Sequence, residues 1–519
     1  MNDQSNVQPA GGQKVMNRGL VVVGAILIQL CLGAIYAWSV FTPALVASDP
    51  ADVAAVYSAS KLGLDQAGLD KMKSELAAPK SELKAVLVDL QELEDATGTA
   101  DVLKRKALEV KRTGLLTAMD AIAVAHGVKD KVDALEYSLT KTQTQIIFSA
   151  GLALFAVVMV MAGRMMPKVG PRKLAVAGGI VLGLGYVLAG LISPGNFWTT
   201  FFLVGIVGGS GIGLGYVVPI AVGMKWFPDK KGMITGLAVA GFGFGALLWI
   251  YLAGQFGNLI ADFGLGTTFL VFGVAFFLLV VIGGLWMVNP PAGWLPAGYK
   301  PPEVTKDKKP AAGTVDYTSG QMLATPQFYM ILLTFAFGAG AGLTVIGCIK
   351  LFAIESMTAS GVEAAKASAV AGTAMALFYA LANGIGRIVW GAVSDAIGRK
   401  ASIIIMTAIQ GVVVILFQWM AGYEYMLYLA AALIGFNFGG NFALFPTITA
   451  DTFGTKNIGQ NYGWVFLAYG IGGIVGPIMS GWLGDQKMFN TAFTILGVMC
   501  LVGALVIAGV KPPKKAVAA

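Results

Sequence analysis

Long apolar runs recur along the chain and constrain its fold more than any other feature. Each run holds about 20 residues, the length that an α-helix needs to cross the roughly 30 Å hydrocarbon core of a bilayer. The composition of the 519-residue chain agrees, with 56% hydrophobic and only 12% charged residues. The sequence therefore predicts an all-α membrane protein with twelve transmembrane helices. The twelve runs cover residues 18–42, 143–163, 172–192, 197–224, 232–256, 267–288, 327–352, 368–392, 401–421, 425–449, 461–484 and 490–511.

Lysine and arginine are distributed unevenly between the loops that join these runs. The loops at 164–173, 225–231 and 399–400 carry two to four basic residues each, whereas those at 193–196 and 254–266 carry none. Basic loops face the cytoplasm in membrane proteins. We therefore expect both termini in the cytoplasm and a multi-pass protein in the plasma (inner) membrane, with the lipid bilayer as a partner. The net charge of +8 reflects this topology and does not indicate nucleic-acid binding.

The second half of the chain repeats the first at an offset of 227 residues. The coincident pairs are Gly208 and Gly435, Gly213 and Gly440, Pro219 and Pro446, Gly232 and Gly459, Gly236 and Gly463, Gly243 and Gly470, and Gly245 and Gly472. Two pseudo-symmetric six-helix bundles follow from this duplication. The predicted units are a cytoplasmic tail at 1–17, an N-terminal bundle at 18–288, a cytoplasmic linker at 289–325, a C-terminal bundle at 326–511 and a cytoplasmic tail at 512–519.

Residues 49–140 are an insertion between the first two apolar runs. They hold 16 of the 28 acidic residues of the chain and its only histidine, His126. Leucines recur every seven residues from Leu62 to Leu90, which is the period of packed helices. We expect an extracytoplasmic helical hairpin, with Pro79 kinking or breaking its first arm. Two roles stay open for it: a solvated decoration with a small core of its own, and an arm that binds a protein partner or drives oligomerisation.

Several motifs resemble those of a known transporter family. The loop GAVSDAIGRK at 391–400 resembles the cytoplasmic signature GxLaDRxGRK of the major facilitator superfamily, and the first-half loop GRMMPKVGPRK has Pro167 where that family prefers aspartate. Four further motifs resemble the oxalate/formate antiporter family and the related monocarboxylate transporters: YAWSVF at 36–41, KWFPDKKGMITG at 225–236, PPAGWLPAGY at 290–299 and NGIGR at 383–387. Outside 49–140, the resemblance implies two bundles that rock about a central cavity.

One arginine, Arg387, lies inside the apolar run at 368–392. It precedes Gly398 in the next loop by eleven residues, a rise of about 16 Å along a helix, so we expect it near the bilayer midplane. Insertion scales assign an arginine there about 2.5–3.5 kcal/mol, which a neighbouring carboxylate usually offsets. All twelve acidic residues outside the insertion map to termini, loops or helix ends.

The missing partner of Arg387 is therefore expected to be the substrate, because a planar guanidinium can donate two parallel hydrogen bonds to a carboxylate. The alternative is an arginine that snorkels to the surface or bonds to backbone carbonyls. The resemblance supports a substrate role, because the family places its substrate arginine in helix 8 at the position that Arg387 matches.

Polar and aromatic residues complete the predicted substrate site. Asn383 lies one turn before Arg387, and Tyr379 lies one turn before Asn383 on the same face. Amides and phenols donate hydrogen bonds without adding charge. The other candidates, on helices that line the cavity in this superfamily, are Tyr36, Tyr216, Asn441 and Tyr469. For any single tyrosine, packing between helices is the alternative.

The resemblance also bears on coupling and on substrate charge. Animal monocarboxylate transporters have an acidic residue implicated in proton coupling at the position of Asn383, so a proton relay there is in doubt. The oxalate antiporter family has a lysine in helix 11 that, with the helix-8 arginine, matches a dianion. The aligned residue here is Tyr469, and the segment 461–473 contains no lysine or arginine. One buried cation matches one negative charge, so the sequence favours monocarboxylates such as formate, lactate or pyruvate.

The predicted function is secondary active transport of small carboxylate anions by alternating access, with proton symport and anion exchange both open. We expect no enzyme, cofactor or metal site, because phosphate-binding loops, metal-ligand spacings and membrane histidines are missing from the sequence. Two alternatives remain. One is a dicarboxylate antiporter of the oxalate/formate type, and the other is a transporter-like sensor that uses the outer hairpin.

Overall fold

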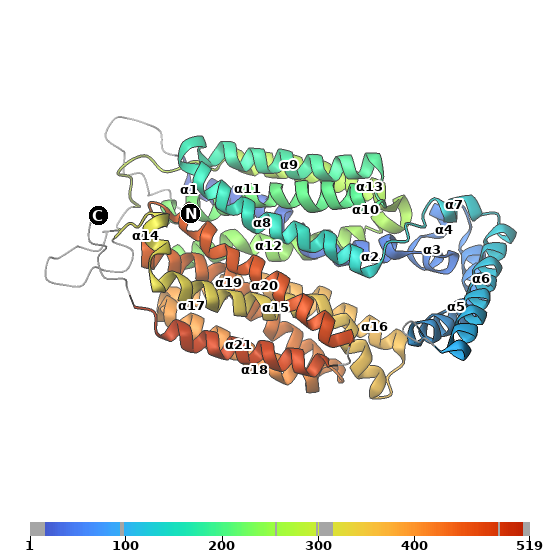
Figure 1. Ribbon diagram of the computed structural model, residues 1–519. Helices are drawn as coiled ribbons and strands as arrows, with labels where there is room; N and C mark the ends of the chain where they lie inside the picture. Colours follow the sequence, from blue (N-terminus) through green and yellow to red (C-terminus); the bar gives the residue numbers. More distant parts are fainter. Residues whose placement is uncertain are drawn as a thin grey trace.

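The computed structural model describes residues 16–93, 98–254, 257–296, 299, 315–485 and 488–511. Within these ranges all regular secondary structure is helical, and twelve helices are long and apolar enough to cross a membrane. Figure 1 shows the long helices running side by side in two groups. The predicted all-α membrane fold with twelve transmembrane helices is confirmed. Residues 1–15 of the predicted tail at 1–17, residues 297–298 and 300–314 of the predicted linker, and the predicted tail at 512–519 lie outside the described ranges.

The first six spans form the N-terminal group. They comprise α1 (Arg18–Leu32), η1 (Gly33–Ala37) and α2 (Trp38–Val46), then α8 (Lys141–Val169), α9 (Pro171–Ile192), α10 (Phe197–Thr200) with η2 (Phe201–Gly208) and α11 (Gly209–Trp226), α12 (Lys231–Ala253), and η3 (Leu259–Phe263) with α13 (Gly264–Leu285). The helices α9 and α13, α8 and α11, and α1 and α12 pack against each other and hold this group together.

The last six spans form the C-terminal group. They follow the short α14 (Ser319–Leu323) and comprise α15 (Pro326–Ala359), α16 (Ala364–Thr373) with η4 (Ala374–Tyr379) and α17 (Ala380–Ile397), α18 (Arg399–Met420), α19 (Glu424–Phe453), α20 (Ile458–Asp485) and α21 (Phe489–Ala508). Here α17 packs on α19, α18 on α21, and α15 on α20. The segments η2, η3 and η4 are π-helical.

Two loop glycines join helices at corresponding places in the two groups. Gly170 links α8 to α9 with φ of 88°, and Gly398 links α17 to α18 with φ of 92°. These backbone angles are strained for any residue with a Cβ, whereas glycine adopts them readily. Each glycine therefore ends one transmembrane helix and starts the next within a single residue.

The two groups meet along α12 and α17, and along α8 and α20. A Cβ added to Gly236 would lie 2.2 Å from the carbonyl oxygen of Arg387, and one added to Gly163 would lie 2.1 Å from that of Gly459. Only glycine permits backbones to approach this closely. The two groups are therefore in close contact near the basic loops, and we call this end of the bundle the basic end.

The insertion contains α3 (Pro50–Val56), α4 (Ala59–Leu62), α5 (Gln66–Glu92), α6 (Thr99–Ala125) and α7 (Lys129–Asp133). The helices α5 and α6 pack on each other and project from the end of the bundle opposite the basic end (Figure 1). The predicted break of the first arm at Pro79 does not occur, because α5 continues as one helix through this residue. Leu76 and Leu83 on either side are buried, and their packing offsets the hydrogen bond that a proline cannot donate.

The insertion is anchored to the N-terminal group. The chain enters and leaves it side by side, because the backbone N–H of Ser138 donates to the carbonyl of Ala47 at 3.0 Å. Within the insertion, Lys80 of α5 pairs with Asp49 at the start of α3 at 2.6 Å, and the Asp49 side chain is only 3% exposed. Lys61 donates to the carbonyl of the last residue of η3 at 2.9 Å.

Candidate functional site

Arg387 occupies the second turn of α17, directly after the π-helical segment η4, and is fully buried. Its Nε donates to Oδ1 of Asn383 at 3.0 Å, one turn earlier on the same helix. Its Nη1 donates to the backbone carbonyl of Val239 in α12 at 3.0 Å. Its Nη2 has no hydrogen-bond partner among the described residues. The guanidinium thus reaches across to the other helix group with one nitrogen still free to bind an acceptor.

Aromatic rings, rather than carboxylates, surround the charge of Arg387. The guanidinium carbon lies 4.2 Å from the ring centroid of Phe442 and 5.2 Å from that of Phe242. Such cation–π contacts contribute about 0.5 to 2 kcal/mol each, the larger values applying to desolvated sites. In the part of the chain that the structure describes, no acidic side chain forms an ion pair with Arg387. The same ranges contain no group of three His, Cys, Asp or Glu side chains that could hold a metal ion.

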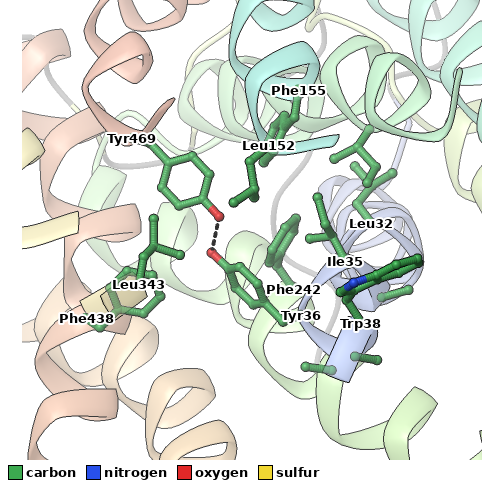
Figure 2. Packing of buried hydrophobic residues seen from close by; sticks show 14 of the residues in the cluster. Leu32, Ile35, Tyr36, Trp38, Leu152, Phe155, Phe242, Leu343, Phe438 and Tyr469 are labelled. Atoms are coloured by element: carbon green, nitrogen blue, oxygen red, sulfur yellow. Dashed lines mark hydrogen bonds between the residues drawn. The ribbon is translucent and has the colours of Figure 1, made fainter. Parts of the chain in front are cut away.

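Tyr36 and Tyr469 connect the two helix groups beside this arginine. The Tyr469 hydroxyl donates to the Tyr36 hydroxyl at 2.9 Å, and Figure 2 shows the bond between η1 and α20 with Phe155, Phe242 and Phe438 around it. Both tyrosine side chains are buried, and the charge of Arg387 acts on both phenols. These residues form a contact between the N-terminal and C-terminal groups at the predicted site.

Tyr216 of α11 approaches the arginine from the N-terminal group. Its ring centroid lies 5.3 Å from that of Phe242, the ring that also faces Arg387. The Tyr216 hydroxyl lies near the guanidinium, but it makes no hydrogen bond of acceptable geometry within the described residues. The structure therefore brings together five of the predicted residues, which are Arg387, Asn383, Tyr36, Tyr216 and Tyr469.

The two other predicted residues turn toward α15 instead. The Tyr379 hydroxyl donates to the carbonyl of Gly342 at 3.1 Å. The Asn441 amide donates to carbonyls of its own helix at 3.1 and 3.3 Å, and its Oδ1 lies against Gly338, 2.8 Å from where a Cβ there would be. Tyr379 still packs on Phe438, at a centroid distance of 6.1 Å. A substrate contact for either residue stays a prediction.

One buried residue near the site was missed from the sequence. Tyr462 of α20 is fully buried, and its hydroxyl has no hydrogen-bond partner in the described ranges. The missed signal was spacing, because Tyr462 lies seven residues, or two helical turns, before Tyr469 and so shares its helix face.

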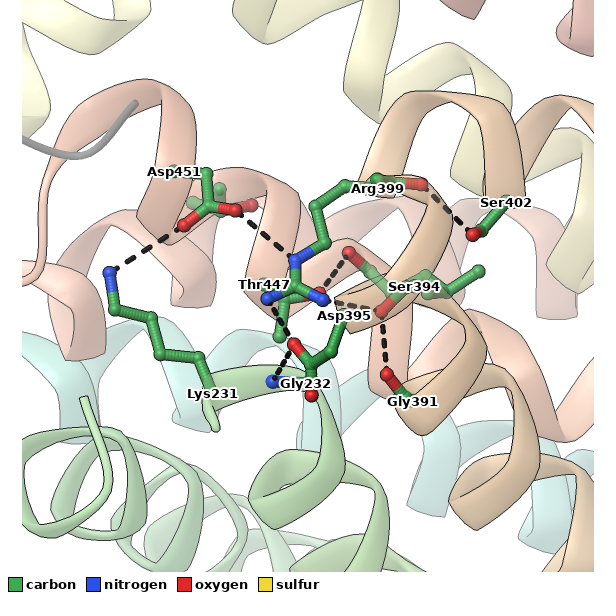
Figure 3. A network of polar contacts seen from close by, with 12 residues as sticks. Lys231, Gly232, Gly391, Ser394, Asp395, Arg399, Ser402, Thr447 and Asp451 are labelled. Carbon is green, nitrogen blue, oxygen red and sulfur yellow. Dashed lines mark hydrogen bonds and ion pairs between the residues drawn. The ribbon is translucent and has the colours of Figure 1, made fainter. Parts of the chain in front are cut away.

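A polar network at the basic end joins the two groups (Figure 3). Asp395 of α17 accepts hydrogen bonds from the backbone N–H groups of Gly232 and Met233, at 3.1 and 2.8 Å, in the first turn of α12. Asp395 also pairs with Arg399 at 2.5 Å, and Arg399 pairs with Asp451 of α19 at 3.1 Å. A carboxylate at a helix N-terminus interacts favourably with the helix dipole. We call this network the latch.

The corresponding contact between α8 and α20 contains no ion pair among the described residues. Pro167 occupies the place where the resembled family prefers aspartate, and the contact there is a stack of Arg164 on Trp464 at 4.8 Å. The latch therefore ties α12 to α17 by charge, whereas α8 and α20 meet mainly through packing of small residues.

Comparison with known proteins identifies relatives of this chain. The family model described as Major Facilitator Superfamily matches residues 112–378 and 366–519. An uncharacterized MFS-type transporter of Escherichia coli (strain K12) is 30% identical over 66% of this chain and 79% of its own length. The oxalate:formate antiporter of Oxalobacter formigenes is 28% identical over 66% and 75%, and the apicoplast pyruvate carrier 1 of Toxoplasma gondii is 24% identical over 93% and 88%.

Solved structures show the same fold. The crystal structure of the human organic anion transporter MFSD10 (TETRAN) matches 96% of this chain and 100% of its own, with a TM-score of 0.57 and 13% sequence identity. At that identity the match reports the arrangement of the helices alone.

Proposed function

This chain belongs to the Major Facilitator Superfamily, and on that premise we propose that it is a secondary active transporter of small carboxylate anions that works by alternating access. The observation that carries the proposal is the environment of Arg387, a fully buried cation with an unpaired Nη2 and no carboxylate partner among the described residues. Hydrogen bonds to charged groups contribute about 1.5–3 kcal/mol each. A bound carboxylate would supply the missing acceptor and the missing negative charge together.

The favoured substrate class is the monocarboxylates, such as formate, lactate or pyruvate. Arg387 is a single positive charge, and the position aligned with the second cation of the oxalate antiporter family is Tyr469. Phe242 and Phe442 flank the guanidinium and would enclose the apolar body of a short acid. Two relatives support the class by their names, an oxalate:formate antiporter and a pyruvate carrier. The oxalate/formate dicarboxylate class remains the second candidate.

Alternating access would separate the two helix groups at one end and then at the other. The latch and the glycine contacts hold the basic end closed in this conformation. Opening would break the bonds of Asp395 to α12 and expose the site to the cytoplasm. Transport is driven either by the gradient of protons that enter with the substrate or by the gradient of a second anion that leaves in exchange. We further propose that both termini are cytoplasmic and that the bilayer is the plasma (inner) membrane.

Substitution of Arg387 in reconstituted proteoliposomes tests the function. A panel of labelled mono- and dicarboxylates at two pH values gives the substrate class and the coupling. We expect Arg387→Ala to abolish carboxylate uptake, and Arg387→Lys to raise the KM about 10- to 100-fold because the planar fork is lost.

The matched control is Arg172→Lys, at an exposed arginine in the first turn of α9, which should leave uptake unchanged. Thermal unfolding of each variant separates loss of binding from loss of fold. Wild-type uptake by Arg387→Ala would overturn the proposal.

A further inference from the structure

Two buried phenols beside Arg387 lack hydrogen-bond partners in the described part of the chain. They are Tyr216 of α11, in the N-terminal group, and Tyr462 of α20, in the C-terminal group, and neither side chain is exposed. The other tyrosines of the site are engaged, because Tyr36 and Tyr469 bond to each other and Tyr379 donates to a backbone carbonyl. A buried polar group without a partner costs about 1–3 kcal/mol. Each such group indicates a missing acceptor.

The rings of these two tyrosines pack against the same phenylalanine. The ring centroid of Phe466 lies 5.2 Å from that of Tyr216 and 5.7 Å from that of Tyr462. The ring centroid of Phe242 lies 5.3 Å from that of Tyr216, and the Phe242 ring also faces the guanidinium of Arg387. Tyr216, Tyr462 and the free Nη2 of Arg387 are therefore three unpaired donors along one continuous set of aromatic rings.

The two phenols of α20 lie at different depths. α20 begins at Ile458 near the basic end, so Tyr462 lies about 6 Å into the helix and Tyr469 about 16 Å, at 1.5 Å per residue. Tyr462 is thus roughly 10 Å nearer the basic end than the Tyr36–Tyr469 contact. A carboxylate that leaves Arg387 and moves toward the basic end would therefore reach the hydroxyl of Tyr462 next.

We propose that the Tyr462 hydroxyl forms a second carboxylate subsite on the basic-end side of Arg387. This inference rests on the proposed carboxylate transport. Tyr216 lies ten residues before the end of α11 and Arg387 ten residues before the end of α17, so these two residues are at about the same depth and Tyr462 is the next donor toward the basic end. The subsite receives the anion as the latch opens, so that the carboxylate exchanges the guanidinium for a neutral donor before it enters water. A neutral phenol holds an anion less tightly than a cation does, which favours release on that side.

Tyr462→Phe tests the subsite, because it removes the hydroxyl and keeps the ring. Transport is measured in proteoliposomes of one verified orientation, with lactate or formate offered from each side in turn. We expect the KM at the basic end to rise about tenfold and the KM at the opposite end to stay within about twofold. Tyr216→Phe, on the other helix group at about the depth of Arg387, should instead raise the KM at both ends, because it alters the site that both entry routes share.

Two readouts separate a binding role from a packing role. Thermal unfolding of substrate-free Tyr462→Phe should not occur at a lower temperature than in the wild type, since the change removes an unsatisfied hydroxyl. The matched control is Tyr186→Phe, at a buried tyrosine that packs on Phe269 and Phe276, and its KM should match the wild type at both ends.

The possible failures are distinguishable. An unchanged KM, or an equal change at both ends, in Tyr462→Phe would overturn the subsite while wild-type transport still depends on Arg387. Absence of carboxylate transport by the wild type, or its survival in Arg387→Ala, would overturn the proposed function itself.

Discussion

At the scale of single residues, hydrogen bonds to neutral groups and contacts with aromatic rings stabilise Arg387. Asn383 and the carbonyl of Val239 satisfy two of its nitrogens, and the ring faces of Phe242 and Phe442 stabilise its charge. The alternative considered from the sequence, bonding to backbone carbonyls, is thus realised for one nitrogen only. Under the proposed function, the remaining nitrogen would favour the binding of an anion, because Nη2 has no hydrogen-bond partner among the described residues and a ligand would supply one.

Replacing Tyr469 by lysine should shift the preference of the site toward dicarboxylates. The Tyr469 side chain is fully buried within electrostatic range of Arg387, so Tyr469→Lys places a second cation beside the first. Like charges at close range cost several kcal/mol unless a ligand neutralises both. We expect the oxalate-to-lactate uptake ratio to rise at least about tenfold in competition assays with proteoliposomes. Tyr469→Phe is the control that removes the hydroxyl without adding charge, and an unchanged ratio in the lysine variant would refute charge matching.

Part of the site could be predicted at this scale. The pairing of Asn383 with Arg387 follows from their spacing of four residues on one helix, which sequence alone determines. The direction of Tyr379 and Asn441 toward α15 depends on how α17 and α19 are rotated against a third helix. That rotation is set by packing between helices, for example by the Tyr379 backbone against Gly435, and it leaves little trace in a single sequence.

At the scale of helices, hydropathy predicted the number and order of the spans because bilayer thickness fixes their length. The π-helical segments η2 and η4 were not predicted, since they arise from hydrogen-bond register within a helix and carry no hydropathy signal. η4 ends at Tyr379, two turns before Arg387. The shift of register there helps to set which face of α17 carries the arginine.

Loss of the Asp395 charge should weaken closure of the basic end. Asp395→Asn removes the pair with Arg399 and weakens the bonds to the first turn of α12. Charge-assisted bonds of this kind contribute about 1.5–3 kcal/mol, so we expect the population open at the basic end to rise about tenfold. Spin labels would be attached to cysteines introduced at Lys168 and Ala396, one in each group. Double electron–electron resonance would then measure the distribution of distances between the two labels.

The control for that experiment is Asp262→Asn in η3, at the opposite end of the bundle, which should leave the label distance distribution unchanged. A distribution identical to wild type in Asp395→Asn would mean that glycine packing alone holds the basic end closed.

At the scale of the whole molecule, the contacts that join the two helix groups lie outside the insertion. These contacts are made by Arg387, by Tyr36 with Tyr469 and by the latch, and they lie within the membrane bundle or at its basic end. The insertion is anchored to the N-terminal group by the hydrogen bond of Lys61 to η3 and by that of the Ser138 N–H to the carbonyl of Ala47. The two ends of its chain run side by side, so its removal leaves a gap that a short linker can close.

Deletion of residues 55–135, closed by a short Gly-Ser linker, should therefore leave carboxylate uptake within about twofold of the full chain. The deletion removes Lys80, the partner of the buried Asp49 carboxylate, and an unpaired buried charge is destabilising. The deletion should accordingly be made together with Asp49→Asn, and the full-length Asp49→Asn variant is its matched control. A folded deletion protein that has lost uptake while this control retains it would show that the insertion takes part in the transport cycle, since the membrane bundle would still hold every contact of Arg387.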